Sequence, residues 1–499
     1  MSKPASRAVR SEPASVQAAI EAFLALALQP VLQEPGELPF PMETGQFELA
    51  QKAGALLVST WDETRQLHRR AIAIAEDRPG RLTLTIERFG GKLGMMVLYD
   101  ESKPASAPLR KQGERHHFRE QLRSLLRKQF PGWRLLDLSA DLDLEHSLSA
   151  NYPRALLRRG QRGLAVIGAA PGPPEPALAL TYGLIWLDYL RRREPNLIID
   201  TLALFLPPLA LTATALRIKW LTGAQFRLFT YTAEGQSQGV DPADCGNLHT
   251  ELLPAQLRER SPLHPDVEVT GISAKAGRGT QPTTTSSSHP TATESVLRES
   301  TRTLRLRGLE VPACSPNELS TVIAEMARLR SPEAPDRLNP LYTRRAEAWL
   351  EAQLRRHLDV VDATLQPAPL YGQVIAVAGV DRGIADVLAV DYDGRLAVLE
   401  IKAEEDIHLP LQALDYWMRI AHHAAQGDFR PRNYFPGIAL RPDPPRLLLV
   451  APALSFHPTT ETILGFFSSN IAVERVGLAL EWRQMVRVLF RYRGAVRPT

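Results

Sequence analysis

The spacing of apolar residues predicts a β-meander near the beginning of the chain. In segment 82–87, Leu-Thr-Leu-Thr-Ile-Glu, apolar and polar side chains alternate with the period of a half-buried strand. Segment 77–80, Asp-Arg-Pro-Gly, has the composition of a tight turn between two such strands. We therefore expect consecutive antiparallel strands over Ala55–Asp100. A helix over Ser15–Leu28, with Ser15 as its N-cap, is expected to precede them.

The last third of the chain has short apolar runs that alternate with helical patterns. Asp393-Gly394 lies between two apolar runs, which is the pattern of a β-hairpin turn. The predicted order is a helix at 342–358, strands at 373–378, 385–391 and 396–402, a helix at 410–424, a strand at 446–450, a helix at 459–467 and a strand at 471–478. This alternation predicts a mixed sheet flanked by helices, so the expected fold class is α/β.

A low-complexity segment divides the chain. Residues 273–303 are rich in Ser, Thr, Gly and Pro and carry too little apolar surface to offset chain entropy. We therefore predict four parts: a helix and β-meander at 1–105, an α/β domain at 106–260, a flexible linker with a short helix (317–328) at 261–330, and a second α/β domain at 331–499.

Composition excludes several classes of protein. The 499 residues are 44% hydrophobic and 23% charged with a formal net charge of +4, which excludes wholesale disorder. The apolar run 196–216 is interrupted by Asp200 and by Pro207-Pro208, so we expect no membrane-spanning helix and no membrane partner. The chain has only two cysteines, Cys245 and Cys314, which rules out a disulfide framework and favours the reducing cytoplasm.

Two acids and a lysine meet in the predicted hairpin 385–402. Glu400 and Lys402 are two residues apart on one strand and point to the same face, while Asp386 lies near Glu400 on the paired strand. Two carboxylates buried together need a neutralising cation, and their oxygens suit Mg²⁺ or Mn²⁺. A lysine beside such an ion suits hydrolysis at phosphorus, because it can position water and stabilise charge on the phosphoryl oxygens.

This arrangement resembles the PD-(D/E)xK nuclease superfamily, in which an acid on one hairpin strand is followed by acid-x-Lys on the next. The matching residues here are Asp386 and Glu400-Ile401-Lys402, with Ala385 in place of the proline. The resemblance implies a restriction-endonuclease-like fold and Mg²⁺-dependent hydrolysis of phosphodiester bonds. It also implies that Asp386, Glu400 and the Ile401 carbonyl hold the metal and that Lys402 is catalytic.

Elements on both sides of the hairpin extend the resemblance, which covers roughly residues 342–493. The family places a glutamate on the preceding helix; Glu351 fits that metal-binding and catalytic role, and Glu347, one turn earlier, is its rival. Gln412 and Tyr416 share one face of the following helix. Their Gln-x-x-x-Tyr pattern is similar to the RecB-like branch and implies that they orient the nucleic-acid backbone or the lysine.

The C-terminal end of the chain is basic. Five arginines and no acid occur between Trp482 and Thr499. We predict that Arg483 and Arg487 bind the nucleic-acid backbone, with a solvated basic strand as an equally weighted alternative.

The α/β region before the linker contains a segment, 154–170, that is similar to 386–402. A gapless comparison places Arg154, Gly168 and Ala170 at the positions of Asp386, Glu400 and Lys402. We hypothesise a degenerate copy of the nuclease-like fold that lost its metal ligands. Its arginines would then bind phosphate without cutting, namely Arg154, Arg158, Arg159 and Arg162. An unrelated α/β domain is the alternative.

Together these patterns predict a metal-dependent nuclease acting on nucleic acid in repair or defence, with DNA favoured over RNA by the resemblance alone. Endonuclease and exonuclease action both remain open. The alternative is a non-catalytic nucleic-acid-binding or regulatory protein that retains the fold. A homodimer is compatible with the sequence. The chain has no helicase or ATPase motif, so any motor would be a separate protein.

Overall fold

The chain folds into two compact units. One comprises Met1–Leu211 with Phe226–Val240, and the other Thr212–Gln225 with Asp241–Thr499. The computed structural model describes residues 11–494 apart from 36, 53, 63–64, 89–90, 247, 249, 256–258, 261–266, 275–299, 307–308, 313–320, 322–323, 326–327, 330, 332–333, 335–336, 339, 344–345 and 379–380.

The first unit begins with a helix that packs on an antiparallel sheet. Helix α1 (Pro13–Leu26) precedes β1 (Pro30–Gln33), β2 (Phe40–Pro41), β3 (Phe47–Lys52), β4 (Ala55–Trp61), β5 (Gln66–Arg78), β6 (Arg81–Glu87) and β7 (Leu93–Asp100). The strand order is β2-β1-β7-β6-β5-β4-β3. Leu84 and Ile86 of β6 are fully buried in one cluster with Ile20 of α1, so the predicted meander is present as β4–β7. The helix begins at Pro13 rather than Ser15, because a proline fits the first helical turn, where its missing N–H costs no hydrogen bond.

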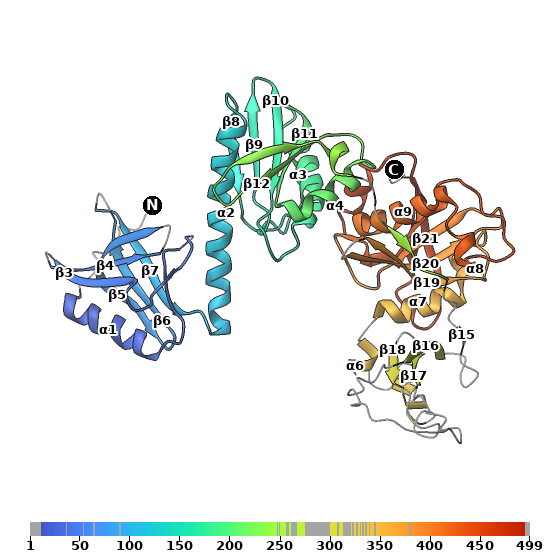
Figure 1. The fold of residues 1–499 in the computed structure, drawn as a ribbon, viewed down its shortest axis with the longest axis horizontal. Coiled ribbons are helices and arrows are strands. Elements are labelled where there is room, and N and C mark those ends of the chain that lie inside the picture. Colours follow the sequence, from blue (N-terminus) through green and yellow to red (C-terminus); the bar gives the residue numbers. More distant parts are fainter. Residues whose placement is uncertain are drawn as a thin grey trace, which may run out of the picture. The chain divides into compact units, whose positions relative to one another are not determined.

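The first unit also contains a second sheet that lies between two helices (Figure 1). Its elements are α2 (Ala107–Gln129), β8 (Arg134–Ser139), β9 (Arg154–Arg159), β10 (Arg162–Gly168), α3 (Ala179–Arg193), β11 (Ile198–Leu206), β12 (Gln225–Tyr231) and β13 (Ser237–Val240). Helix α4 (Pro208–Ile218), between β11 and β12 in the chain, belongs mostly to the second unit. The strand order is β13-β12-β11-β10-β9-β8. Leu122 of α2 packs with Val166 in the core of one face, and Gly183 of α3 lies against Ile167 and Leu202 on the other.

The second unit is built on a seven-stranded sheet in the order β14-β19-β20-β21-β22-β23-β24. Its elements are β14 (Glu251–Leu252), α6 (Pro340–Thr343), α7 (Ala346–Arg356), α8 (Leu358–Val361), β19 (Tyr371–Ala378), β20 (Asp381–Val390), β21 (Leu396–Ile401), α9 (Leu409–Gln426), β22 (Arg446–Pro452), α10 (Thr460–Leu464), β23 (Ala472–Leu478) and β24 (Val488–Arg493). Leu350 of α7 packs with Leu399 and Ile401 in the core of one face. The helix expected over 342–358 is interrupted. The basic end of the chain contributes strand β24, as the alternative of a basic strand in this region allowed.

Six strands of this sheet repeat the arrangement of the second sheet in the first unit. Each begins with a helix and an antiparallel pair, β8/β9 in one and β19/β20 in the other. A hairpin then leads through a helix to a parallel strand, giving β10 beside β11 and β21 beside β22. Each ends in an antiparallel pair, β12/β13 and β23/β24. The helix, hairpin, helix and strand order expected for residues 118–235 is therefore present.

The segment predicted as a linker, 261–330, contains strands at its two ends. A four-stranded sheet in the order β15-β16-β17-β18 comprises β15 (Glu259–Arg260), β16 (Val267–Ala274), β17 (Ser300–Leu306) and β18 (Leu309–Pro312). The linker boundaries were therefore too wide, since apolar residues at 267, 269, 304 and 306 give these ends strand character. The low-complexity run 275–299 and most of the expected helix 317–328 lie outside the described residues.

These sheets and helices make the chain a mixed α/β protein, as predicted. The long helices among the described residues are all too polar to cross a membrane.

One glycine of the β20–β21 hairpin is predicted to be essential for its turn. Gly394 has φ +83°, and a Cβ there would lie 2.1 Å from the carbonyl oxygen of Ala439. We expect Gly394→Ala to lower the free energy of unfolding by about 2 to 3 kcal/mol, from backbone strain and the clash together. Gly427, at φ +71° with no atom near its Cβ position, is the matched control, and Gly427→Ala should cost only about 1 kcal/mol. Equal losses for the two variants in urea unfolding would contradict the close approach at Gly394.

Candidate active site

The candidate site lies where β20 and β21 meet. Val387 pairs with Leu399, so Asp386 lies opposite Glu400. The Oδ2 atom of Asp386 accepts a hydrogen bond of 2.9 Å from the backbone N–H of Ile401. The hairpin register therefore brings the two predicted carboxylates together, as the alternation of the strands required.

Both carboxyl groups are held away from water. Burial, together with the charge of Glu351, raises the pKa of Asp386 to about 7, although the Ile401 N–H opposes this. Glu400 is only 2% exposed, and burial followed by the nearby Asp386 raises the pKa of its carboxyl well above the usual range. Oε2 of Glu400 receives no hydrogen bond from the described residues. Such a group is stable when it is protonated or bound to a cation.

Lys402 lies among three acids. Its Nζ is 3.8 Å from Glu400, 3.7 Å from Glu347 and 3.6 Å from Asp406. Burial lowers the pKa of the Lys402 ammonium, but the acids, Glu400 first, more than reverse this and raise it. The group is therefore a fixed positive charge beside the two carboxyls. Asp406 was not singled out from the sequence, although its position four residues after Lys402 in an acidic run was the available signal.

Helix α7 supplies both glutamates that the sequence offered. Glu351 is buried, lies 3.8 Å from Arg355, and raises the pKa of Asp386 through its charge after the larger effect of burial. Gly372 of β19 allows this packing, since a Cβ there would lie 2.9 Å from the Glu351 carboxylate. Glu347 is exposed and contacts Lys402 instead. The charge of Glu351 therefore acts on Asp386, whereas Glu347 contacts Lys402 and its charge acts on both Asp386 and Glu400.

Helix α9 faces the acids with its Gln-x-x-x-Tyr motif. Burial raises the pKa of the Tyr416 phenol, and the charges of Glu400 and Asp386 add to the effect, which places Tyr416 beside the pair. Oε1 of Gln412 is buried and receives no hydrogen bond from the described residues. Tyr416 is therefore near enough to act on a group bound at the site, and Gln412, one turn earlier on α9, has an unused acceptor.

The predicted basic contacts do not join this cluster. The Arg483 guanidinium lies over the Trp482 ring at 4.3 Å, and burial lowers its pKa. Arg487 forms an ion pair of 2.9 Å with Glu481. Glu474 pairs with both Arg491 and Arg493. The four of these arginines that the structure describes are thus engaged within the chain, and β24 brings Arg491 and Arg493 against Glu474, an acid of the neighbouring strand.

The donor set fits a hard divalent cation, although no preformed cluster of three acidic, His or Cys ligands occurs among the described residues. The observation that supports a fit is that Oε2 of Glu400, beside Asp386, is buried and receives no hydrogen bond from the described residues. These two carboxylates, with the Ile401 carbonyl and Glu351, are the residues that would hold the ion. Carboxylate and carbonyl oxygens are the ligands that Mg²⁺ and Mn²⁺ prefer.

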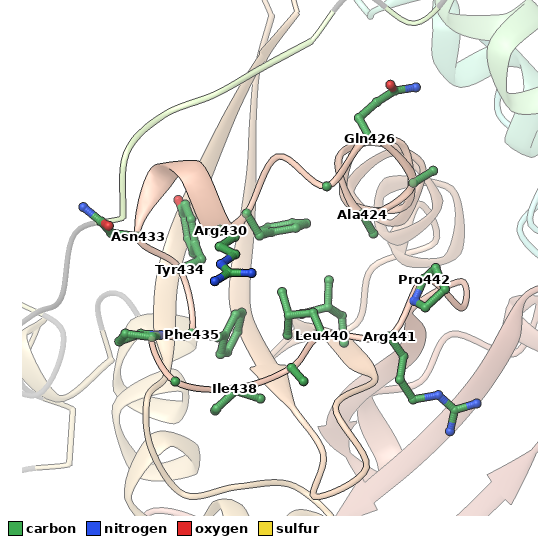
Figure 2. A pocket seen from close by; sticks show the side chains of 17 residues that line it. Ala424, Gln426, Arg430, Asn433, Tyr434, Phe435, Ile438, Leu440, Arg441 and Pro442 are labelled. Atoms are coloured by element: carbon green, nitrogen blue, oxygen red, sulfur yellow. The ribbon is translucent and has the colours of Figure 1, made fainter.

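One hollow of about 910 Å³ lies apart from this site (Figure 2). It is bounded by the end of α9, by the loop that follows and by Leu396, at the opposite end of β21 from Glu400. None of the sequence-predicted site residues lines it.

The positions of the first unit that correspond to Asp386, Glu400 and Lys402 carry neither an acid nor a lysine. Arg154 pairs with Ile167 in the antiparallel hairpin, as Asp386 lies opposite Glu400. Ile167 pairs with Leu204, three residues before a proline, as Glu400 pairs with Leu449. Ala169 donates its N–H to the Phe205 carbonyl, as Lys402 donates to that of Val450. Ile167 and Ala169 therefore stand at the positions of Glu400 and Lys402. The gapless comparison with Gly168 and Ala170 was wrong by one residue, because this hairpin is one residue shorter.

In the sheet of the first unit, Arg154 and Trp186 occupy the space that corresponds to the two acids. Arg154 is 6% exposed, donates to the Asp141 carbonyl at 3.0 Å and lies over the Trp186 ring at 5.6 Å. Trp186 is the eighth residue of α3, as Tyr416 is of α9. A buried arginine in these contacts does not reach an external phosphate, so this part of the phosphate-binding hypothesis is wrong.

The chain is therefore a mixed α/β protein in which two sheets share the same order of six strands. The sheet of the second unit carries two adjacent acids, Asp386 and Glu400, beside a lysine. No family model, no curated protein and no solved structure matches the chain.

Proposed function

We propose that the second unit is a metal-dependent nuclease of restriction-endonuclease-like fold that hydrolyses phosphodiester bonds in nucleic acid. The observation that carries the proposal is the half-buried Asp386 opposite the buried Glu400, whose Oε2 receives no hydrogen bond from the described residues and whose carboxylate lies 3.8 Å from Lys402. Such an arrangement costs folding energy unless it serves a cation or a reaction. DNA is the substrate class that the resemblance implies, in repair or defence.

Each residue has a definite task in this proposal. Asp386 and Glu400 would hold Mg²⁺ or Mn²⁺, which when bound polarises the phosphoryl group and lowers the pKa of an attacking water. The Ile401 N–H fixes the Asp386 carboxylate in place. Lys402 donates hydrogen bonds to the phosphoryl oxygens and to the water, and Glu347 and Asp406 hold its ammonium in position. Tyr416 and Gln412 limit the access of solvent and orient the phosphate backbone.

The test is cleavage of labelled DNA and RNA by the full chain in Mg²⁺, Mn²⁺ or EDTA. Substrates should include single strands, duplexes, flaps and mismatches. We expect cleavage only with metal, and a loss of about 10²- to 10³-fold in kcat for Asp386→Ala and for Lys402→Ala, because each removes a group that stabilises transition-state charge. Asp393→Asn, on the exposed turn of the same hairpin, should cleave like the wild type.

The competing proposal is a non-catalytic nucleic-acid-binding or regulatory protein with the same fold. It predicts metal-independent binding, no cleavage of any substrate, and equal binding by wild type, Asp386→Ala and Lys402→Ala. That set of results would replace the nuclease proposal.

A further inference from the structure

Four exposed arginines lie at the turn end of the β9–β10 hairpin in the first unit, and we call them the arginine edge. They are Arg134, Arg158, Arg159 and Arg162. Arg134 pairs with Arg158 across β8 and β9, and Arg159 pairs with Arg162 across the hairpin. Residues directly opposite one another in antiparallel strands point to the same face. Each face of this edge therefore carries a pair of adjacent guanidinium groups.

The arginine edge has no acidic partners among the described residues. Two arginines at the end of α3, by contrast, are paired: Arg193 contacts Asp137 at 3.1 Å, and Arg192 contacts Asp188 at 2.9 Å. Like charges directly opposite each other destabilise a sheet. Two such pairs at one edge, left without carboxylates, are therefore a cost to folding that a polyanion would relieve.

The rest of this sheet contains no group that could act on such a polyanion. The positions equivalent to Asp386, Glu400 and Lys402 hold the buried Arg154, Ile167 and Ala169. Helix α2 adds charge of the same sign, with seven basic residues against two acidic ones over Ala107–Gln129. The sheet thus keeps an exposed positive surface without the residues for hydrolysis.

We infer that residues 107–240 are a degenerate copy of the second-unit fold that binds the phosphate backbone of duplex DNA, without sequence preference, through the arginine edge. Arginine suits this task, because its planar fork donates two hydrogen bonds to one phosphate. The inference rests on the proposed function for the choice of DNA, whereas the surface and its charge do not depend on cleavage. It replaces Arg154 of the sequence hypothesis by the exposed Arg134.

The test is a salt titration of DNA binding by the full chain. The triple variant Arg134→Gln, Arg158→Gln and Arg162→Gln should be compared with wild type on a labelled duplex of about two dozen base pairs, in EDTA, between about 50 and 200 mM NaCl. Each lost phosphate contact reduces the slope of log K against log salt by about 0.9, so we expect a reduction of about 2 to 3. The dissociation constant at the low-salt end should rise on the order of tenfold or more.

A matched control removes the same charge elsewhere. Arg70, Arg78 and Arg328 are exposed and paired with glutamates, so their triple Gln variant should leave the slope unchanged. Equal effects of the two variants would show a net-charge effect and overturn the inference, as would unchanged DNA binding in the arginine-edge variant. Unfolding in low salt adds an independent readout, since removing opposed like charges should leave stability unchanged or raise it.

The two proposals fail in different ways. If no substrate is cleaved but the slope falls only in the arginine-edge variant, the nuclease proposal fails and this inference stands. If cleavage is normal and the slope is unchanged, the inference alone fails. A variant that loses binding to an acidic protein but not to DNA would assign the edge to a protein partner and would also overturn it.

Discussion

Replacing Asp386 by Asn is expected to raise the free energy of unfolding of the metal-free protein by about 4 kcal/mol at pH 8. Burial raises the pKa of the Asp386 carboxyl from 3.8 to about 7 in the folded chain. The folded state therefore holds a proton that the unfolded state has already released. Stability is fully present below about pH 4 and is lost as the pH rises through 7. Asn cannot ionise, and its carbonyl can still accept the Ile401 N–H.

The measurement is urea unfolding in EDTA at pH 5 and pH 8. Wild type should lose most of this free energy between the two pH values, and Asp386→Asn should lose much less. Mg²⁺ or Mn²⁺ should stabilise wild type at pH 8 and leave the variant unchanged, because a ligand stabilises only the state that binds it. Asp393→Asn is the control, with a change within about 0.5 kcal/mol. A wild-type protein equally stable at both pH values would contradict the burial of the acid pair.

The parts of the site that the sequence predicted depend on local geometry. Glu400 and Lys402 share a face because strand side chains alternate, and the Asp-Gly turn returns Asp386 to the facing strand. The i, i+4 spacing placed Gln412 and Tyr416 on one face of α9, and Tyr416 lies beside the acids. These relations hold within a few residues or across one turn, so no long-range contact is needed to infer them.

The parts that the sequence did not predict depend on contacts between distant segments. Arg491 and Arg493 looked like a free basic end, but β24 pairs with β23 and brings them to Glu474. The one-residue error at Gly168 has a similar cause, since only the pairing of β10 with β11 fixes the register of the shorter hairpin. The residue pattern of one β-strand carries no information on which distant strand pairs with it.

Replacing Arg446 by Ala is expected to lower the free energy of unfolding by about 3 to 5 kcal/mol, because it leaves two buried acids short of their main partner. The Arg446 guanidinium contacts Asp362 at 2.5 Å and Glu474 at 2.6 Å, and it also donates to the Thr364 hydroxyl at 3.0 Å. Arg491 bridges the same two acids. The four charged groups join the residue after α8 with β22, β23 and β24, segments that no local pattern connects.

The pH dependence of this network has the opposite sign to that of Asp386. Burial alone would raise the pKa of Asp362, but hydrogen bonds from Thr364 and Arg446 lower it to about 2. A depressed pKa contributes stability above the ordinary value, and that stability, about 2 kcal/mol, is lost as the pH falls from about 4 through 2. Arg446→Ala should lower the stability at pH 7. It should also reduce the amount of stability that is lost as the pH falls from about 4 through 2.

Urea unfolding at pH 7 and acid unfolding of wild type, Arg446→Ala and Arg446→Lys test this account. Lysine keeps the charge but not the planar fork, so it should recover only part of the loss. Arg441→Ala is the control, since Arg441 pairs with Asp443 at the exposed surface and a solvent-screened pair contributes little, so its loss should leave stability nearly unchanged. Equal effects at Arg446 and Arg441 would mean that the buried network contributes no more than a surface pair. Catalysis is a second readout, because Arg446 lies at the end of β22 opposite to Val450 and Lys402, and the folded fraction of Arg446→Lys should cleave at the wild-type rate.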